Sequence, residues 1–155
     1  LYPHHFANGQ LVYPKQHKKP NALMLKTDVR KWLMPNGYYV IVKRFSAKEE
    51  RRRVVAYVVN PSQIGADLVG FENHWNVFHF SKQGIDPLIA KGLACFLNST
   101  EFDQHFRIFS GHTQVNATDL RNMRYPALKT LRKLGKRYRP ELTQSEIDSF
   151  VMAQQ

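Results

Sequence analysis

The chain has 155 residues, and its 23 Lys and Arg against 12 Asp and Glu give a formal net charge of +11. A hydrophobic content of 43% suffices for the core of one domain, and the charge predicts a polyanionic partner, nucleic acid before an acidic membrane. No apolar run approaches the roughly 18 residues that a transmembrane helix needs, so no membrane partner is expected.

The single cysteine, Cys95, excludes an internal disulfide and a zinc site built on paired thiols. It lies in an apolar stretch and is expected to be buried. A reducing compartment follows, and we expect a cytoplasmic protein. The chain starts at Leu1 without an initiator Met or a signal-peptide pattern, so a fragment of a longer protein is expected.

The first half of the chain predicts a small β-sheet. A short helix is expected over 27–33, ended by Pro35-Asn36-Gly37. Residues 38–42, Tyr-Tyr-Val-Ile-Val, are aromatic and β-branched and predict a buried strand, with 54–59 as its partner strand. Residues 69–80 predict a further strand, or a strand and a loop.

Helices dominate the second half. Asp86 and Pro87 form an N-cap and first-turn pair for a helix with one apolar face, made of Ile89, Leu93, Phe96 and Leu97. A second helix is expected after Ser99-Thr100. It would pack on the same core through Phe102, Phe106 and Phe109 and end at a left-handed cap on Gly111.

Two more helices are expected near the end of the chain, after a short turn from Thr118 to Pro126. In one, Leu128, Leu131 and Leu134 form the packed side, opposite Lys129, Arg132, Lys133 and Lys136. Thr143 and Glu146 form a capping box for the last helix. The predicted fold class is therefore α+β, with a small β-sheet early in the chain followed by a helical C-terminal half.

Two basic segments, 43–53 and 121–139, hold fourteen of the twenty-three Lys and Arg residues. The second has eight basic residues and no acid. Several cations on one surface favour phosphate binding, whereas an ordinary solvated helix face usually mixes both signs. From these segments the predicted DNA contacts are Lys43, Arg44, Ser46, Lys48, Arg51, Arg52, Arg53, Arg121, Arg124, Lys129, Arg132 and Lys133.

Polar loops supply candidates for contacts with bases. The segment 110–116 carries hydroxyl, imidazole and amide side chains, which can bind base edges or phosphates. A structural turn, in which these groups cap nearby backbone, is an equally good interpretation. The candidate residues are Asn73, His74, His112, Thr113, Gln114 and Asn116.

A metal site is the weaker interpretation of the histidines. Residues 73–79, Asn-His-Trp-Asn-Val-Phe-His, superficially resemble the His-Asn-His pattern of metal-dependent nucleases, which would use His74 and His79. No pair of acidic ligands stands at a suitable spacing, and a glycine-rich phosphate loop and a GxSxG motif are absent. The chain is therefore predicted to be non-catalytic and to hold no cofactor.

Several longer strings together carry a family resemblance. They are 43–53, Gly70-Phe71-Glu72-Asn73-His74, Phe96-Leu97-Asn98-Ser99-Thr100, the string from Ser110 to Arg121, and Tyr125-Pro126. They resemble the C-terminal region of bacterial N6-adenine DNA methyltransferases of type II restriction-modification systems, in the Eco57I and TaqI-like group. The resemblance covers roughly Tyr2 to Pro126.

The resemblance implies a target-recognition domain over 1–126, with 127–155 as a helical extension packed on or flanking it. In that family a separate N-terminal domain binds S-adenosylmethionine and methylates adenine through an Asn/Asp-Pro-Pro-Tyr/Phe motif, which this sequence lacks. The implied partners are duplex DNA and that missing catalytic domain. Half of a type I specificity subunit is an alternative, and an RNA-binding module suits the charge equally well.

Overall fold

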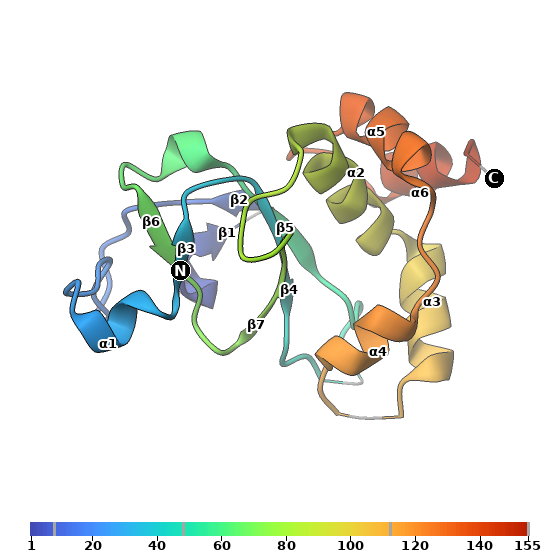
Figure 1. Ribbon diagram of the computed structural model, residues 1–155. Coiled ribbons are helices and arrows are strands. Elements are labelled where there is room, and N and C mark those ends of the chain that lie inside the picture. Colours follow the sequence, from blue (N-terminus) through green and yellow to red (C-terminus); the bar gives the residue numbers. More distant parts are fainter. Residues whose placement is uncertain (8, 48, 112, 155) are drawn as a thin grey trace.

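The computed structural model describes residues 1–7, 9–47, 49–111 and 113–154 (Figure 1). Two candidate DNA contacts, Lys48 and His112, lie outside the described residues. The structure is mixed α and β, and all its strands precede the long helices. Within the described residues, no helix is both long and apolar enough to cross a bilayer.

The central sheet has three antiparallel strands in the order β5-β4-β7, with bounds Ala56–Val59, Tyr39–Lys43 and Trp75–Phe78. Tyr39 pairs with Val59, and Val40 pairs with Phe78. The middle strand β4 is buried on both faces, which explains why its sequence is continuously apolar instead of alternating. The strands predicted at 38–42 and 54–59 are confirmed.

Among the described residues, two further two-stranded sheets occur where one small sheet was expected. β1 (Phe6–Ala7) pairs with β2 (Gln10–Leu11), and β3 (Leu33–Pro35) pairs with β6 (Leu68–Gly70). α1 is shorter than predicted, Thr27–Arg30, because Leu33 joins β3. The stretch 69–80 therefore contributes to two different sheets. Short 3-10 turns cover Pro3–His5 and Pro61–Gln63.

Helices α2 (Pro87–Leu97) and α3 (Thr100–Phe109) cover one face of the central sheet. The Asp86 side chain accepts hydrogen bonds from the amides of Leu88 and Ile89, which confirms the predicted N-cap. Val40 and Val42 of β4 point into a core shared with the helices, made of Val40, Val42, Val54, Ala56, Ala90, Leu93, Ala94, Leu97, Phe102, Phe106, Val115 and Leu120. Tyr39 and Ile41 face a second core under the N-terminal strands.

The remaining helices are α4 (Ala117–Asn122), α5 (Leu128–Arg137) and α6 (Gln144–Met152). Both bonds of the predicted capping box between Thr143 and Glu146 are present at the start of α6. A third cluster joins α2, α5 and α6 through Cys95, Leu134, Ile147 and Val151. Cys95 is buried, as predicted.

Helices α2 and α5 cross at two glycines. A Cβ on Gly92 would lie 1.8 Å from the Leu131 carbonyl oxygen, and one on Gly135 would lie 1.9 Å from the Leu88 carbonyl oxygen. Each helix therefore rests on the bare backbone of the other. This close contact fixes which face of α5 is turned to solvent.

Three expectations about the helices were wrong. Phe109 is 52% exposed instead of packing on the core, because α3 ends there and the chain turns away. The φ angle of Gly111 is not in the left-handed region, and the C-cap of α3 is instead Ser110 in an extended conformation. Leu128, at the first position of α5, is exposed because it precedes the contact with α2.

Candidate nucleic-acid interface

Two loops that are distant in sequence meet at one end of the central sheet. Phe45 and Gln114 form an isolated antiparallel bridge, and the amide of Val115 donates to the Arg44 carbonyl at 2.9 Å. The Asn76 side chain donates to the Val115 carbonyl at 2.8 Å, which ties the second loop to β7. The basic segment after β4 and the polar loop before α4 therefore form one continuous surface.

The side chains on this surface combine an aromatic ring with polar and charged groups. Phe45 is 49% exposed, and its ring forms a T-shaped pair with the His74 ring, with 5.0 Å between the ring centres. The Arg44 guanidinium lies 5.8 Å from the Phe45 ring centre. We call Arg44, Phe45, Asn73, His74, Thr113 and Gln114 the joined-loop surface.

A shallow cavity of about 330 Å³ lies within the joined-loop surface, between the two loops. Phe45, Thr113 and Gln114 line it together with Ser46, Ala47 and Glu50. The amide of Ala47 donates to the Glu50 carboxylate at 3.0 Å, so the acid caps its own turn. Amide, hydroxyl and aromatic groups therefore line the cavity beside the Glu50 carboxylate.

A buried carboxylate holds the basic loop in place. Asp103 of α3 accepts hydrogen bonds from the amides of Arg53 and Val54 at 2.7 and 2.8 Å. The second carboxylate oxygen of Asp103 accepts from Nε of Arg107 at 2.8 Å, and Arg107 also donates to the Glu50 carbonyl at 2.7 Å. The second half of the loop is therefore fixed to α3.

Two predicted DNA contacts, Ser46 and Arg53, are buried inside this loop. Arg53 is 3% exposed, and its guanidinium donates to the carbonyls of Ser46 and Thr113. The Ser46 hydroxyl donates back to the Arg53 carbonyl at 2.8 Å. In this structure both residues support the joined-loop surface from beneath and have almost no surface for a phosphate contact.

Arg52 also points inward and links the loop to α6. Its guanidinium donates to the Gln144 side chain at 2.7 Å. Burial lowers the pKa of Arg52, while the nearby carboxylates of Asp103 and Asp148 raise it. Of the three consecutive arginines, only Arg51 is exposed.

The two histidines proposed as metal ligands have other partners. Nδ1 of His74 lies 2.8 Å from a Glu72 carboxylate oxygen, and the His79 ring accepts a hydrogen bond from the Lys82 amide at 3.1 Å. Within the described part of the chain, no three His, Cys, Asp or Glu side chains come together as a metal site would require. The geometry gives the nuclease interpretation no support.

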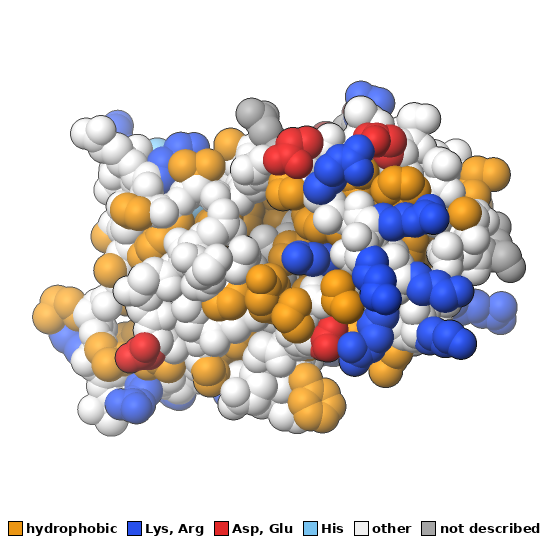
Figure 2. Space-filling view, turned by 90° about the horizontal axis from the view of Figure 1, so that it is seen from above, with side chains coloured by type: hydrophobic (Ala, Val, Ile, Leu, Met, Phe, Trp, Pro, Cys, Tyr) orange, Lys and Arg blue, Asp and Glu red, His pale blue; other side chains and the backbone are white. Residues whose placement is uncertain are grey.

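A second basic surface lies on α5. Lys129, Arg132, Lys133 and Lys136 are spaced at i, i+3, i+4 and i+7 and are all exposed; we call them the α5 stripe. Arg132 also pairs with Asp86, with 2.9 Å between the charged atoms. Figure 2, seen from the end of the molecule where α5 lies, shows Lys and Arg gathered over the helical half.

The two basic segments do not merge into one patch. The joined loops and α4 lie at one end of the molecule, and α5 lies at the opposite end (Figure 1). Arg121, on α4, therefore lies at the joined-loop end although it belongs to the second segment. Arg124 is exposed in the connection to α5, Lys43 is half-buried at the end of β4, and Asn116 occupies the N-cap position of α4.

Phe45 is the main residue of this surface that was not among the predicted contacts. The sequence does not single it out, because one aromatic residue inside a basic run shows no helical or strand periodicity. The signal that could have identified it is its position directly after Arg44 in a basic run. Aromatic side chains among cations are typical of nucleic-acid surfaces.

The chain is similar to part of two curated proteins. It is 56% identical over 136 residues to type II methyltransferase M.BsuBI of Bacillus subtilis, covering 88% of this chain and 27% of that protein. It is 42% identical over 153 residues to type II methyltransferase M.PstI of Providencia stuartii, covering 97% of this chain and 30% of that protein. No family model matches the chain, and no solved structure matches it.

The chain thus spans about three tenths of the length of these relatives. The predicted similarity to type II methyltransferases is confirmed by these two relatives. The narrower Eco57I and TaqI-like grouping, and the position of the matching region within the enzyme, remain predictions.

Proposed function

We propose that this chain is the DNA target-recognition part of a type II N6-adenine DNA methyltransferase. It binds duplex DNA and helps to select the site, while another part of the enzyme binds S-adenosylmethionine and transfers the methyl group. The similarity to two type II methyltransferases supports the assignment to this class of enzyme. The lack of an Asn/Asp-Pro-Pro-Tyr/Phe motif is in keeping with a part that does not catalyse.

The joined-loop surface is the observation that carries the recognition role. Gln114 and Thr113 present amide and hydroxyl groups, which can hydrogen-bond to base edges in the major groove. Phe45 offers an apolar ring for a thymine methyl group or for a base displaced from the stack, and Arg44 adds a cation beside it. Backbone bonds on both loops hold these groups in fixed positions, which favours selectivity.

The α5 stripe supports a separate role in affinity. Four cations on one helix face can neutralise phosphates without reading sequence. Because the stripe and the joined-loop surface lie at opposite ends of the molecule, we assign phosphate contact to the first and base contact to the second.

Methyl transfer by the full-length enzyme tests this function. The enzyme is incubated with S-adenosylmethionine that carries a labelled methyl group and with duplex DNA, and N6-methyladenine is quantified after digestion. We expect labelled N6-methyladenine at one short sequence, and structured RNA of equal length should compete at least tenfold more weakly than duplex DNA. Absence of methylation, or preference for RNA, would refute the proposal.

A further inference from the structure

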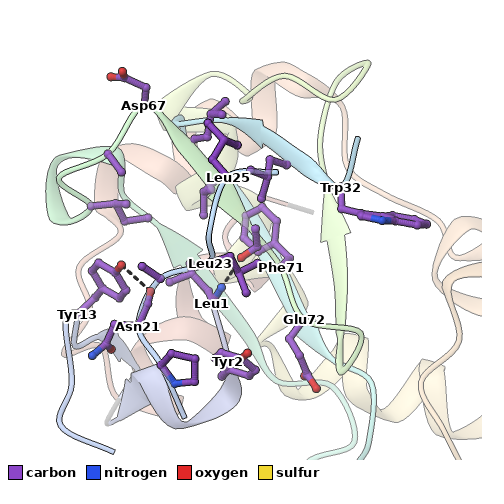
Figure 3. Close-up of a pocket in the computed structure, with 18 residues that line it drawn as sticks. Leu1, Tyr2, Tyr13, Asn21, Leu23, Leu25, Trp32, Asp67, Phe71 and Glu72 are labelled. Carbon is purple, nitrogen blue, oxygen red and sulfur yellow. Dashed lines mark hydrogen bonds between the residues drawn. The ribbon is translucent and has the colours of Figure 1, made fainter. Parts of the chain in front are cut away.

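An apolar groove of about 470 Å³ lies beside β6, in the N-terminal half of the chain (Figure 3). Its lining includes Leu1, Leu23, Leu25, Trp32, Leu68 and Phe71. Leu1, Leu23 and Phe71 meet near its middle, whereas Trp32 stands at one side. The joined-loop surface contributes no residue to it.

Several large apolar side chains that line the groove are exposed to solvent. Leu23 and Leu25 are each 59% exposed, and Trp32 is 71% exposed. Ala22, Leu23 and Leu25 line the groove, whereas Met24 does not. Large apolar side chains gathered in one groove offer a surface that a further segment can cover.

Leu1 pairs with the backbone on this side of β6. The Leu1 nitrogen donates to the Gly70 carbonyl, and the Glu72 amide donates to the Leu1 carbonyl at 3.1 Å. This pattern is that of a parallel strand pair in which Leu1 stands opposite Phe71. Leu1 therefore runs in the same direction as β6 and lies along its edge.

The same edge of β6 continues into the groove. The Asn36 amide donates to the Asp67 carbonyl, so the peptide groups of Asp67 face β3. Because the peptide groups of successive strand residues face opposite edges, those of Val69 face β3 as well. The peptide groups of Leu68 and Gly70 consequently face the opposite edge, where Leu1 lies. A strand that precedes Leu1 would therefore lie along this edge, beside Gly70 next to Leu1 and beside Leu68 further from it.

We propose that the residues directly before Leu1 in the longer enzyme fill this groove as a strand parallel to β6. The residue two positions before Leu1 donates to the Leu68 carbonyl and accepts from the Gly70 amide, and apolar side chains of the strand cover Leu23 and Leu25. This inference rests on the proposed function, because that function places these residues within a longer methyltransferase. It identifies the groove as the place where the chain enters from the rest of the enzyme.

Thiol labelling of the full-length enzyme tests the proposal. Leu25→Cys and Leu23→Cys place a thiol in the groove, and Met24→Cys is the matched control that faces away from it. With the groove open, the exposed fractions of the side chains differ only modestly, at 59% for each leucine and 77% for Met24. A filled groove should slow maleimide labelling at positions 23 and 25 at least tenfold relative to position 24. Similar rates at all three positions would overturn the proposal.

Hydrogen exchange in the unsubstituted full-length enzyme gives an independent measurement. The Gly70 amide should exchange at least tenfold more slowly than that of Gly65, which lies in open surroundings. Fast exchange at Gly70 combined with slow labelling would mean a different occupant, such as a second copy of the chain, and would also overturn the proposal. Methyl transfer is measured separately, so an inactive enzyme with a protected groove would refute the proposed function alone.

Discussion

The Asp103 carboxylate accepts a hydrogen bond from the Arg53 amide at 2.7 Å, and this contact fixes the end of the basic loop to α3. Asp103 is itself buried. Three donors converge on it, the amides of Arg53 and Val54 and the side chain of Arg107. The second half of the basic loop, beside the joined-loop surface, is therefore held by one internal carboxylate.

Replacing Asp103 by alanine should destabilise the chain strongly. The Asp103→Ala variant leaves two buried amides without an acceptor and removes a charged partner from Arg107, so we expect a loss of about 2–4 kcal/mol in the free energy of unfolding. Urea denaturation measures it. The exposed Asp67 provides the control, and Asp67→Ala should change stability by less than about 0.5 kcal/mol. Equal effects of the two changes would contradict the role given to Asp103.

The contact between α2 and α5 predicts an intolerance of any side chain at Gly92. A Cβ there would lie 1.8 Å from the Leu131 carbonyl oxygen, so Gly92→Ala must push the helices apart and should cost about 3 kcal/mol or more. Gly65→Ala meets no atom within 4 Å and is the matched control. Melting temperatures of the two variants should therefore differ clearly, and a native-like Gly92→Ala would disprove the close helix contact.

Burial of Cys95 and Tyr138 predicts a loss of stability at alkaline pH. Burial raises the pKa of the Cys95 thiol to about 11 and that of the Tyr138 phenol to about 12. The unfolded chain releases these protons nearer the ordinary values, about 8.5 and 10. As the pH rises, the unfolded chain loses these protons before the folded chain does. The free energy of unfolding should therefore fall as the pH rises from about 9 to 12.

Urea unfolding between pH 8 and 11 measures this dependence. The Tyr138→Phe variant should show a smaller decrease above pH 10, because its buried phenol is gone. A decrease of the same size in Tyr138→Phe would exclude Tyr138 as one of its sources.

The α5 stripe should contribute affinity for DNA without contributing selectivity. Replacing Lys129, Lys133 and Lys136 with Gln removes three exposed cations and leaves the pair of Arg132 with Asp86 intact. If all three contact phosphates, the slope of log affinity against log salt should become less steep by about 2–3. Fluorescence anisotropy from 50 to 200 mM salt measures it.

The matched control for the stripe is Lys18→Gln, which removes one exposed cation from the N-terminal half. This variant should leave the slope nearly unchanged. A triple variant with the same slope as the unsubstituted protein would show that the stripe does not contact DNA.

The parts of the fold that were predicted correctly have strong local signals. β4 is a run of apolar residues between turn signals, α2 begins at an Asp-Pro pair, and the α5 stripe follows helical spacing. β3 was missed, and β6 was not separated from β7 within the predicted stretch 69–80, because strands of three residues are too short to show an alternating pattern. Their pairing is decided by contacts between residues distant in sequence.

The candidate site could be predicted only in part. The polar and basic loops were identified from composition, but the bridge between Phe45 and Gln114 joins segments that share no local pattern. Arg51, Arg52 and Arg53 are identical in type, yet one is exposed and two point inward. What separates them is the position of Asp103 and Gln144 in the folded chain, which the arginine run itself does not reveal.

Selection from a pool of random duplexes tests most directly whether the joined-loop surface reads sequence. The unsubstituted full-length enzyme should enrich one short sequence, whereas Gln114→Ala should lose at least about tenfold of that preference and keep its salt-dependent binding to unselected DNA. Gln83→Ala, an exposed glutamine in a different turn, should enrich the same sequence as the unsubstituted protein. Undiminished enrichment by Gln114→Ala, or none by the unsubstituted enzyme, would contradict sequence reading by this surface.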